Sequence, residues 1–167
     1  MIKKITVAVS ALLLFGSASS PYGNRPWDGA YSPVFIERSE LERSVSYRDG
    51  GRSPVNPGKI YYRAPYIFIN ERYRGIHVIN NSDPSHPVNE GFIVAPGCTD
   101  MAMKGDILYI DNAVDLVAFD FAAKTVTERI RNVLPEPAAP DKSVYYGSRP
   151  RDFVLAGWEK VTARNPE

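Results

Sequence analysis

The chain has 167 residues, of which 44% are hydrophobic and 23% are charged, with 20 Lys and Arg residues against 19 Asp and Glu residues. This near-neutral balance argues against a nucleic-acid-binding protein, which would carry a strongly basic face. The composition also excludes collagen-like, disulfide-rich and wholly disordered chains, and one cysteine cannot form an internal disulfide. The length by itself suits one domain with a hydrophobic core.

The start of the chain predicts a secretion signal. Lys3 and Lys4 are basic, an apolar stretch follows at 5–15, and small residues come next at 16–18. The apolar stretch is short for a membrane span, and this order of segments is that of a cleavable signal peptide. We therefore expect residues 1–18 to direct export to the periplasm, the cell surface or the medium; the alternative is a buried N-terminal strand or helix. Ser17 stands where a lipoprotein would have its acylated cysteine, and the mature chain has no apolar run long enough for a transmembrane helix.

Residues 19–57 predict an N-terminal arm with one short helix, because they are rich in Pro, Gly, Ser and Arg. Ser39 and Glu42 have the spacing of a capping box, in which each side chain accepts from a backbone N–H at the start of the helix. The helix is expected at about 40–46, and the Asp49-Gly50-Gly51 segment ends it.

Short segments of apolar, β-favouring residues, separated by turn residues, follow between Gly58 and Leu134. They predict two sets of four strands, one in 58–97 and one in 98–134. The middle strands are almost continuously apolar, which indicates cover on both faces, whereas the last strand alternates with polar residues, as an outermost strand does. The expected strands are 59–63, 66–70, 75–80 and 89–95, then 100–103, 107–111, 115–120 and 126–133.

The two sets resemble each other. Residues 66–70 match 107–111, and residues 75–80 match 115–120, at an offset of about 40 residues that is typical of four-stranded propeller blades. The predicted fold is therefore all-β, with about two antiparallel propeller-type blades forming an incomplete β-propeller. An eight-stranded β-sandwich is the alternative fold.

Two segments carry a family resemblance. Residues 116–120 (LVAFD) and 76–80 (IHVIN) look like copies of the LVIVD repeat, and the Ser-Asp-Pro within 81–87 resembles that family's turn before the outermost strand. The chain thus resembles the LVIVD-repeat family of exported bacterial and archaeal β-propeller proteins, with a weaker likeness upstream through 33–35 and 39–47. The resemblance implies a propeller of several blades, often lipidated, and no established reaction or catalytic residue. This chain departs from the family in lacking the lipoprotein cysteine and in holding about two repeats.

The remainder of the chain leaves the predicted propeller open. Residues 135–167 predict an exposed Pro-rich linker at 135–140, because proline lacks the N–H that a sheet ladder needs, and then the start of a further strand at 152–162. Closed propellers usually need at least four blades. We therefore expect either a truncated chain or a homo-oligomer that completes the propeller.

If the sets are blades, the loops between their second and third strands share one rim with the connections between blades. That rim would gather Glu71 and Cys98 with the candidate binding residues Arg72, Arg74, Asp100, Asp111, Asn112 and Asp115. A divalent cation on Asp100, Asp111 and Asp115 is the alternative, since hard cations prefer carboxylate oxygens. No DxDxDG-type spacing supports a metal, however, and Asp and Asn are ordinary turn residues.

Cys98 and the two histidines are expected to be structural. An isolated cysteine is more often a small buried hydrophobe than a reactive thiol. His77 lies within an apolar strand and is expected to be a satisfied core residue, whereas His86 lies in an exposed turn. Tyr61, Tyr62, Tyr66 and Tyr73 would suit a sugar-binding surface, but tyrosine is equally common in plain strands.

The expected function is a non-enzymatic binding or scaffolding module at the cell envelope that contacts a protein or a polysaccharide. No paired acid and base sit in a recognisable setting, and no GKS/T or GxGxxG loop is present, so no catalytic residue and no cofactor are expected. The alternative is a hydrolase or lyase that uses rim carboxylates such as Asp111 and Asp115.

Overall fold

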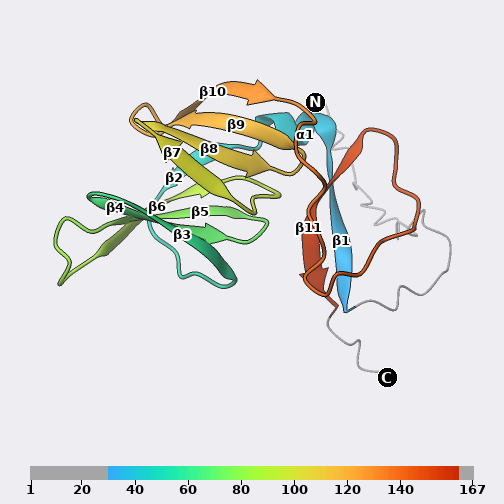
Figure 1. Ribbon diagram of the computed structural model, residues 1–167, viewed down its shortest axis with the longest axis horizontal. Helices are drawn as coiled ribbons and strands as arrows, with labels where there is room; N and C mark the ends of the chain where they lie inside the picture. The colour runs from blue at the N-terminus through green and yellow to red at the C-terminus, as the bar shows by residue number, and fades with distance from the viewer. Residues whose placement is uncertain (1–29, 162–167) are drawn as a thin grey trace, which may run out of the picture.

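The computed structural model describes residues 30–161, which form three antiparallel sheets and one short helix in an open arrangement (Figure 1). The predicted signal peptide at 1–18 lies outside the described residues. Within residues 30–161 no helix is long and apolar enough to cross a membrane. The elements in chain order are β1 (Tyr31–Glu37), α1 (Arg38–Arg43), β2 (Ser46–Asp49), β3 (Pro57–Arg63), β4 (Tyr66–Glu71), β5 (Gly75–Asn80), β6 (Val88–Val94), β7 (Met101–Lys104), β8 (Ile107–Asn112), β9 (Asp115–Asp120), β10 (Thr125–Ile130) and β11 (Phe153–Lys160).

The two predicted sets of four strands are present as two sheets. The first set forms the order β6-β5-β4-β3, which β2 extends to five strands, and the second forms the order β10-β9-β8-β7. Each set is a meander in which consecutive strands pair antiparallel. The polar strand β10 is an edge strand, as its alternating sequence predicts.

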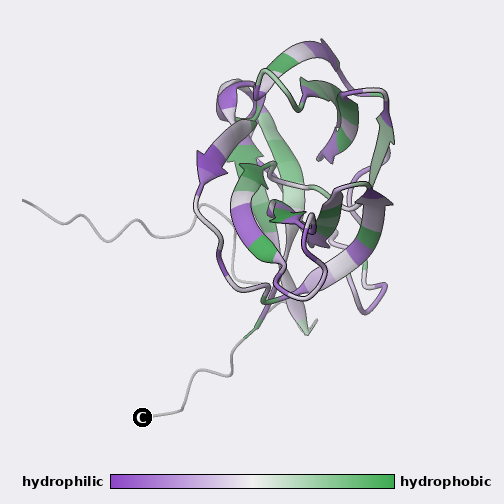
Figure 2. Cartoon of the chain, turned by 90° about the vertical axis from the view of Figure 1, so that its left-hand side faces the viewer, coloured by the Kyte–Doolittle hydropathy of each residue, from purple (hydrophilic) through white to green (hydrophobic). Residues whose placement is uncertain are grey.

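The main core lies between these two sheets. Phe68, Ile76 and Val78 of the five-stranded sheet are fully buried against Leu108 and Phe119 of the four-stranded sheet. Aromatic edge-to-face contacts add to the packing, since Phe121 lies 5.2 Å from Phe68 between ring centroids. Viewed from the side, hydrophobic stretches recur along the strands of both sheets (Figure 2).

The two sheets stack front to back, which means that one face of the five-stranded sheet packs on the opposite face of the four-stranded sheet. Phe68 faces the four-stranded sheet, but its repeat equivalent, Tyr109, faces outward and is 37% exposed. Conversely Leu108 is buried in the core, whereas its equivalent, Ile67, lies on the outward side of β4 because neighbouring strand residues alternate faces. Equivalent residues therefore point in the same direction along the stack. A sandwich related by a two-fold axis would instead pack equivalent faces together. Residues 30–161 do not form a closed propeller.

A separate two-stranded ladder lies to one side of the stack. β1 pairs antiparallel with β11 over its whole length (Figure 1). A second cluster packs on it, in which Ala139, Leu155 and Trp158 are buried and Tyr73 reaches in from the β4–β5 turn. This ladder joins residues that are more than 100 positions apart in the chain.

The predicted N-terminal arm contains more structure than the sequence indicates. β1 and β2 both lie within 19–57, where only a helix was expected. Pro33 interrupts the β pattern of β1, and β2 is a four-residue strand with three exposed positions, so neither carries a strong strand signal. Both strands form because a partner strand from elsewhere in the chain supplies their hydrogen bonds.

The helix and the Pro-rich segment also differ from expectation. Glu37, not Ser39, is the N-cap residue of α1, and no side chain caps it; the Ser39 hydroxyl instead donates to the Glu37 carboxylate at 2.6 Å. The capping-box prediction is therefore wrong, and the helix begins two residues earlier than expected.

The segment 135–140 is not a free linker, because Pro137 and Ala139 are buried. The further strand predicted at 152–162 is confirmed as β11.

Candidate functional site

A pocket of about 610 Å³ lies where the β4–β5 and β8–β9 turns meet, and we call it the rim pocket. The two turns share this end of the stack because the Tyr73 N–H donates to the Cys98 carbonyl at 2.8 Å and Gly97 packs on Ala113. A side chain at Gly97 would collide with Ala113, and its φ of +80° also favours glycine. The pocket is lined by residues 57–59, 70, 72–73, 99, 111, 113 and 134–140.

Charged side chains line one part of the rim pocket. Lys59 of β3 pairs with Asp100, which precedes β7. Burial by itself would raise the pKa of Asp100, but hydrogen bonds from Lys59 and from the Met101 N–H outweigh it and lower that pKa. Arg72 is exposed at the pocket, and its guanidinium makes no hydrogen bond or ion pair with any part of the chain that the structure describes.

Two carboxylates line the rim pocket, Asp111 and Glu136, and Glu136 is paired with Arg149. The Thr99 hydroxyl donates to the Oδ2 of Asp111 at 2.7 Å. Burial raises the pKa of Asp111 above its ordinary value, and the negative charge of Asp100 adds to the rise. Asp111 can therefore accept hydrogen bonds when it is ionised, and it takes up a proton, and can then donate a hydrogen bond, more readily than an ordinary Asp.

Asn70 offers the pocket an unused acceptor. Its Nδ2 donates to the Gly75 carbonyl at 3.2 Å and to the Cys98 carbonyl at 3.3 Å. Its Oδ1 is buried and has no hydrogen-bond partner within residues 30–161, although Asn70 lines the pocket. A buried acceptor without a partner is costly, so a ligand donor that reaches it after a small shift of the pocket wall would satisfy it.

The Pro-rich segment 134–140 forms the opposite wall. The Leu134 N–H donates to the Val114 carbonyl at 3.0 Å, which holds the segment beside the β8–β9 turn. The Tyr73 hydroxyl donates to the Ala138 carbonyl and the Trp158 indole donates to the Pro137 carbonyl, both at 2.8 Å. These bonds satisfy carbonyl acceptors of a segment that cannot join a sheet ladder, and they hold the segment in place as a wall.

The structure places the predicted rim residues in three different settings. Arg72 and Asp111 line the rim pocket. Asp100 lies beside the pocket, where it forms an ion pair with the lining residue Lys59. Arg74 lies in the same turn and is exposed, but it does not line the pocket.

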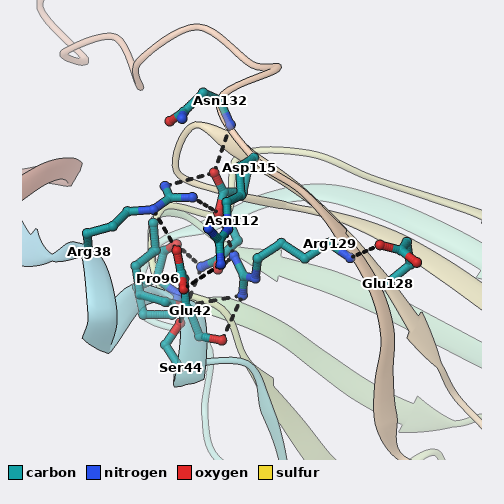
Figure 3. Close-up of polar contacts among 11 residues, drawn as sticks. Arg38, Glu42, Ser44, Pro96, Asn112, Asp115, Glu128, Arg129 and Asn132 are labelled. Carbon is teal, nitrogen blue, oxygen red and sulfur yellow. Dashed lines mark hydrogen bonds and ion pairs between the residues drawn. The ribbon is translucent and has the colours of Figure 1, made fainter.

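Asn112 and Asp115 belong to a buried polar network instead (Figure 3). Arg38 of α1 donates to both carboxylate oxygens of Asp115 at 2.9 Å, and Arg129 of β10 donates to Oδ2 at 2.7 Å. Arg129 also donates to Asn112 at 2.7 Å and reaches carbonyls at the end of α1. The Asn132 N–H completes the set. The network clamps α1 to the four-stranded sheet and leaves Asp115 fully buried.

Glu71 has a similar structural role in the first repeat. Its carboxylate accepts from the N–H groups of Val55 and Asn56 at 2.9 and 2.6 Å and contacts His77 Nε2 at 3.0 Å. Burial opposes ionisation, but these bonds prevail and lower the pKa of Glu71. His77 is fully buried, as expected, although its Nδ1 has no hydrogen-bond partner in the part of the chain that the structure describes. His86 is exposed and contacts Asp83, as its turn position predicts.

Cys98 is fully buried beside Asn70, as the preference of isolated cysteines predicts. Burial raises the pKa of its thiol, and the nearby charge of Asp111 raises it further. The thiolate that reacts with electrophiles is therefore scarce.

We expect Cys98 to remain unlabelled by a thiol reagent such as DTNB in the native protein and to react fully in denaturant. Spectrophotometric titration of thiols at neutral pH measures both. Rapid, stoichiometric labelling of the folded protein would contradict the buried, protonated state.

Four contributors to the rim pocket were not predicted as site residues: Lys59, Asn70, Thr99 and the 134–140 wall. Lys59, Asn70 and Thr99 lie at or next to the ends of predicted strands and could have been included. No local sequence pattern predicts the wall, because a Pro-rich segment resembles a linker unless the surface on which it packs is known.

Among residues 30–161, no group of three or more His, Cys, Asp or Glu side chains is placed to hold a metal ion. The polar and basic groups of the rim pocket are suited to hydrogen bonding and charge pairing with an organic ligand. No protein-family model, no curated protein and no solved structure matches this chain.

Proposed function

We propose that the chain is an exported, β-propeller-type binding module of the cell envelope and that its rim pocket binds a polysaccharide. Residues 1–18 support export, and the LVIVD-like segments at 76–80 and 116–120 support a repeat protein of the propeller type. The front-to-back stacking of the two sheets agrees with that type of repeat.

The observation that carries the proposal is the set of polar groups in the rim pocket that lack partners. Arg72 presents a guanidinium with no partner among the described residues, and the buried Oδ1 of Asn70 has none either. Asp111 adds a second acceptor beside them. Sugar hydroxyls both donate and accept, so they match this mixture, and a carboxylated sugar would also pair with Arg72.

An enzymatic role has less support from the same geometry. Of the two carboxylates named for a hydrolase or lyase, Asp111 lines the pocket, whereas Asp115 is buried and held by two arginines. A pair of carboxylates around a scissile bond needs both groups at the ligand. Asp115 is therefore not available as the second group.

Replacing Arg72 with alanine is expected to weaken binding of carboxylated envelope oligosaccharides about tenfold to hundredfold, because a charge-assisted hydrogen bond contributes about 1.5–3 kcal/mol. Calorimetric titration with a panel of acidic and neutral oligosaccharides measures this. Arg74→Ala is the matched control, since Arg74 lies in the same turn outside the pocket, and it should bind like the wild type. The proposal fails if no oligosaccharide binds the native protein or if both variants lose affinity equally.

A further inference from the structure

Both sheets present apolar side chains on the faces that point away from the shared core. On the five-stranded sheet, Ile60 and Tyr62 are 68% and 62% exposed. On the four-stranded sheet, Ile130 is 51% exposed. The ladder β1–β11 lies at one side and contacts α1 (Figure 1), so within residues 30–161 it does not cover these faces. The outward five-stranded face comprises Ile60, Tyr62, Ile67, Ile69 and Ile79, and the outward four-stranded face comprises Ala102, Tyr109, Leu116, Ala118 and Ile130.

The outer part of the five-stranded face is already covered by its own chain. The segment 50–56 crosses it, and the Arg52 guanidinium lies 3.3 Å from the centroid of the Phe92 ring. Phe92 and His77 are buried as a result. The part that remains open is formed by β3 and β4.

Each outward face is formed by the repeat equivalents of the residues that form one half of the core. In the core, Phe68, Ile76 and Val78 pack against the four-stranded sheet. Their repeat equivalents are Tyr109, Leu116 and Ala118 on the outward four-stranded face. Similarly, the core residues Met101, Met103, Leu108, Ile110 and Phe119 are equivalent to Ile60, Tyr62, Ile67, Ile69 and Ile79 on the outward five-stranded face.

The charges at the outer strands of the two faces are also complementary. Glu128 of β10 pairs with Ala118 and thus lies on the outward four-stranded face. Arg48 of β2 pairs with Phe92, which places it on the outward five-stranded face near Arg52. In the core the outermost strands β2 and β10 approach each other. Repeating the same stack would bring Glu128 toward these arginines.

We infer that a second copy of this chain docks its outward five-stranded face on the outward four-stranded face of the first, which repeats the front-to-back packing of the core. Such a contact joins two different surfaces and is heterologous, so each copy keeps one free face. Repetition gives a closed ring if the rotation closes and an open filament if it does not. The inference rests on the sheet packing and stands without the rim-pocket proposal.

The test uses three Tyr→Glu variants of the purified chain. Tyr62→Glu charges the five-stranded face, Tyr109→Glu charges the four-stranded face, and Tyr146→Glu is the matched control on a loop, where Tyr146 is 90% exposed. Sedimentation velocity over a concentration series should show self-association of the wild type and of the control. Each face variant should raise the dissociation constant at least about a hundredfold, because an unpaired charge would be buried at the contact.

Mixing the two face variants identifies the geometry. Each variant retains one intact face, so an equimolar mixture should form a dimer and nothing larger. Circular dichroism and urea midpoints that match the wild type show that the variants are folded, and Ile60→Glu and Ile130→Glu replace any variant that is not. A monomeric wild type, a face variant that assembles like the control, or a mixture that stays monomeric would each overturn the inference.

Discussion

Replacing Asp115 with alanine is expected to lower the free energy of unfolding by about 3–5 kcal/mol, because it leaves two largely buried arginines without their counter-ion. Arg38 and Arg129 are 21% and 12% exposed and both bind the Asp115 carboxylate. The Asn132 N–H would lose its acceptor as well. Urea denaturation followed by circular dichroism measures the change, which is a large fraction of the stability of a typical domain.

An exposed ion pair provides the control for this prediction. Asp106 lies 3.1 Å from Arg63, and their side chains are 66% and 40% exposed. Asp106→Ala should change the free energy of unfolding by at most about 1 kcal/mol. Equal losses in the two variants would show that the buried network does not hold α1 on the sheet.

The Asp115 effect should also depend on pH. Burial opposes the charged form, but hydrogen bonds from Asn132, Arg38 and Arg129 lower the pKa of Asp115 below its ordinary value. A lowered pKa in the folded state contributes stability that is present above the unfolded pKa, near 4, and is lost as the pH falls through the folded value. The difference between the wild type and Asp115→Ala should therefore shrink below about pH 4.

Replacing Phe68 with alanine is expected to destabilise the protein by about 3–5 kcal/mol, because it removes a fully buried ring and leaves a cavity. Phe68 lies at the centre of the core between the two sheets and contacts the Phe121 ring. The two sheets should unfold together as one cooperative unit, and denaturation followed by fluorescence and by circular dichroism should give coincident curves.

The repeat supplies a matched control for Phe68. Tyr109 occupies the equivalent position of the second repeat but points outward. In the dissociated chain, Tyr109→Ala should cost no more than about 1 kcal/mol, as surface substitutions usually do. Comparable costs at the two positions would contradict the front-to-back stacking.

The strands of the middle region could be predicted from the sequence because their signals are local. Alternation, continuous apolar runs and turn residues define β3 to β10, and each strand pairs with its neighbour in the chain. Hairpin neighbours need no long-range information, since the connecting turn brings the partners together. The self-similarity of 66–70 and 107–111 likewise indicates two equivalent units.

The strands β1 and β2 could not be predicted because their partners are distant. Tyr31 pairs with Lys160 and Ser46 pairs with Val94, so neither strand is stabilised by a neighbour in the chain. The predicted helix N-terminus was wrong for a related reason. Arg38, the first residue of α1, binds Asp115 of β9, a distant contact, and the observed N-cap, Glu37, lies two residues before the predicted cap, Ser39.

The candidate site was partly predictable. Sequence reasoning placed Arg72 and Asp111 at one rim because turns that follow equivalent strands lie at the same end of stacked sheets. It placed Asp115 there too, but the side chain turns toward Arg38 and Arg129 and away from the rim pocket. Asp115 is the first residue of β9 and lies on the same buried face as Val117, whereas α1, which supplies Arg38, is brought there by the fold.

The sequence by itself determined an all-β chain with two similar antiparallel units, an edge strand at β10 and a buried cysteine, because periodicity and turn chemistry act over a few residues. Only the tertiary structure decided three further features: the Asp115 network, the 134–140 wall of the rim pocket and the direction in which each sheet faces. These depend on contacts between segments tens of residues apart. The near-neutral net charge argued against a basic nucleic-acid-binding surface. Only the fold showed which charged side chains are paired and that the Arg72 guanidinium has no partner among residues 30–161.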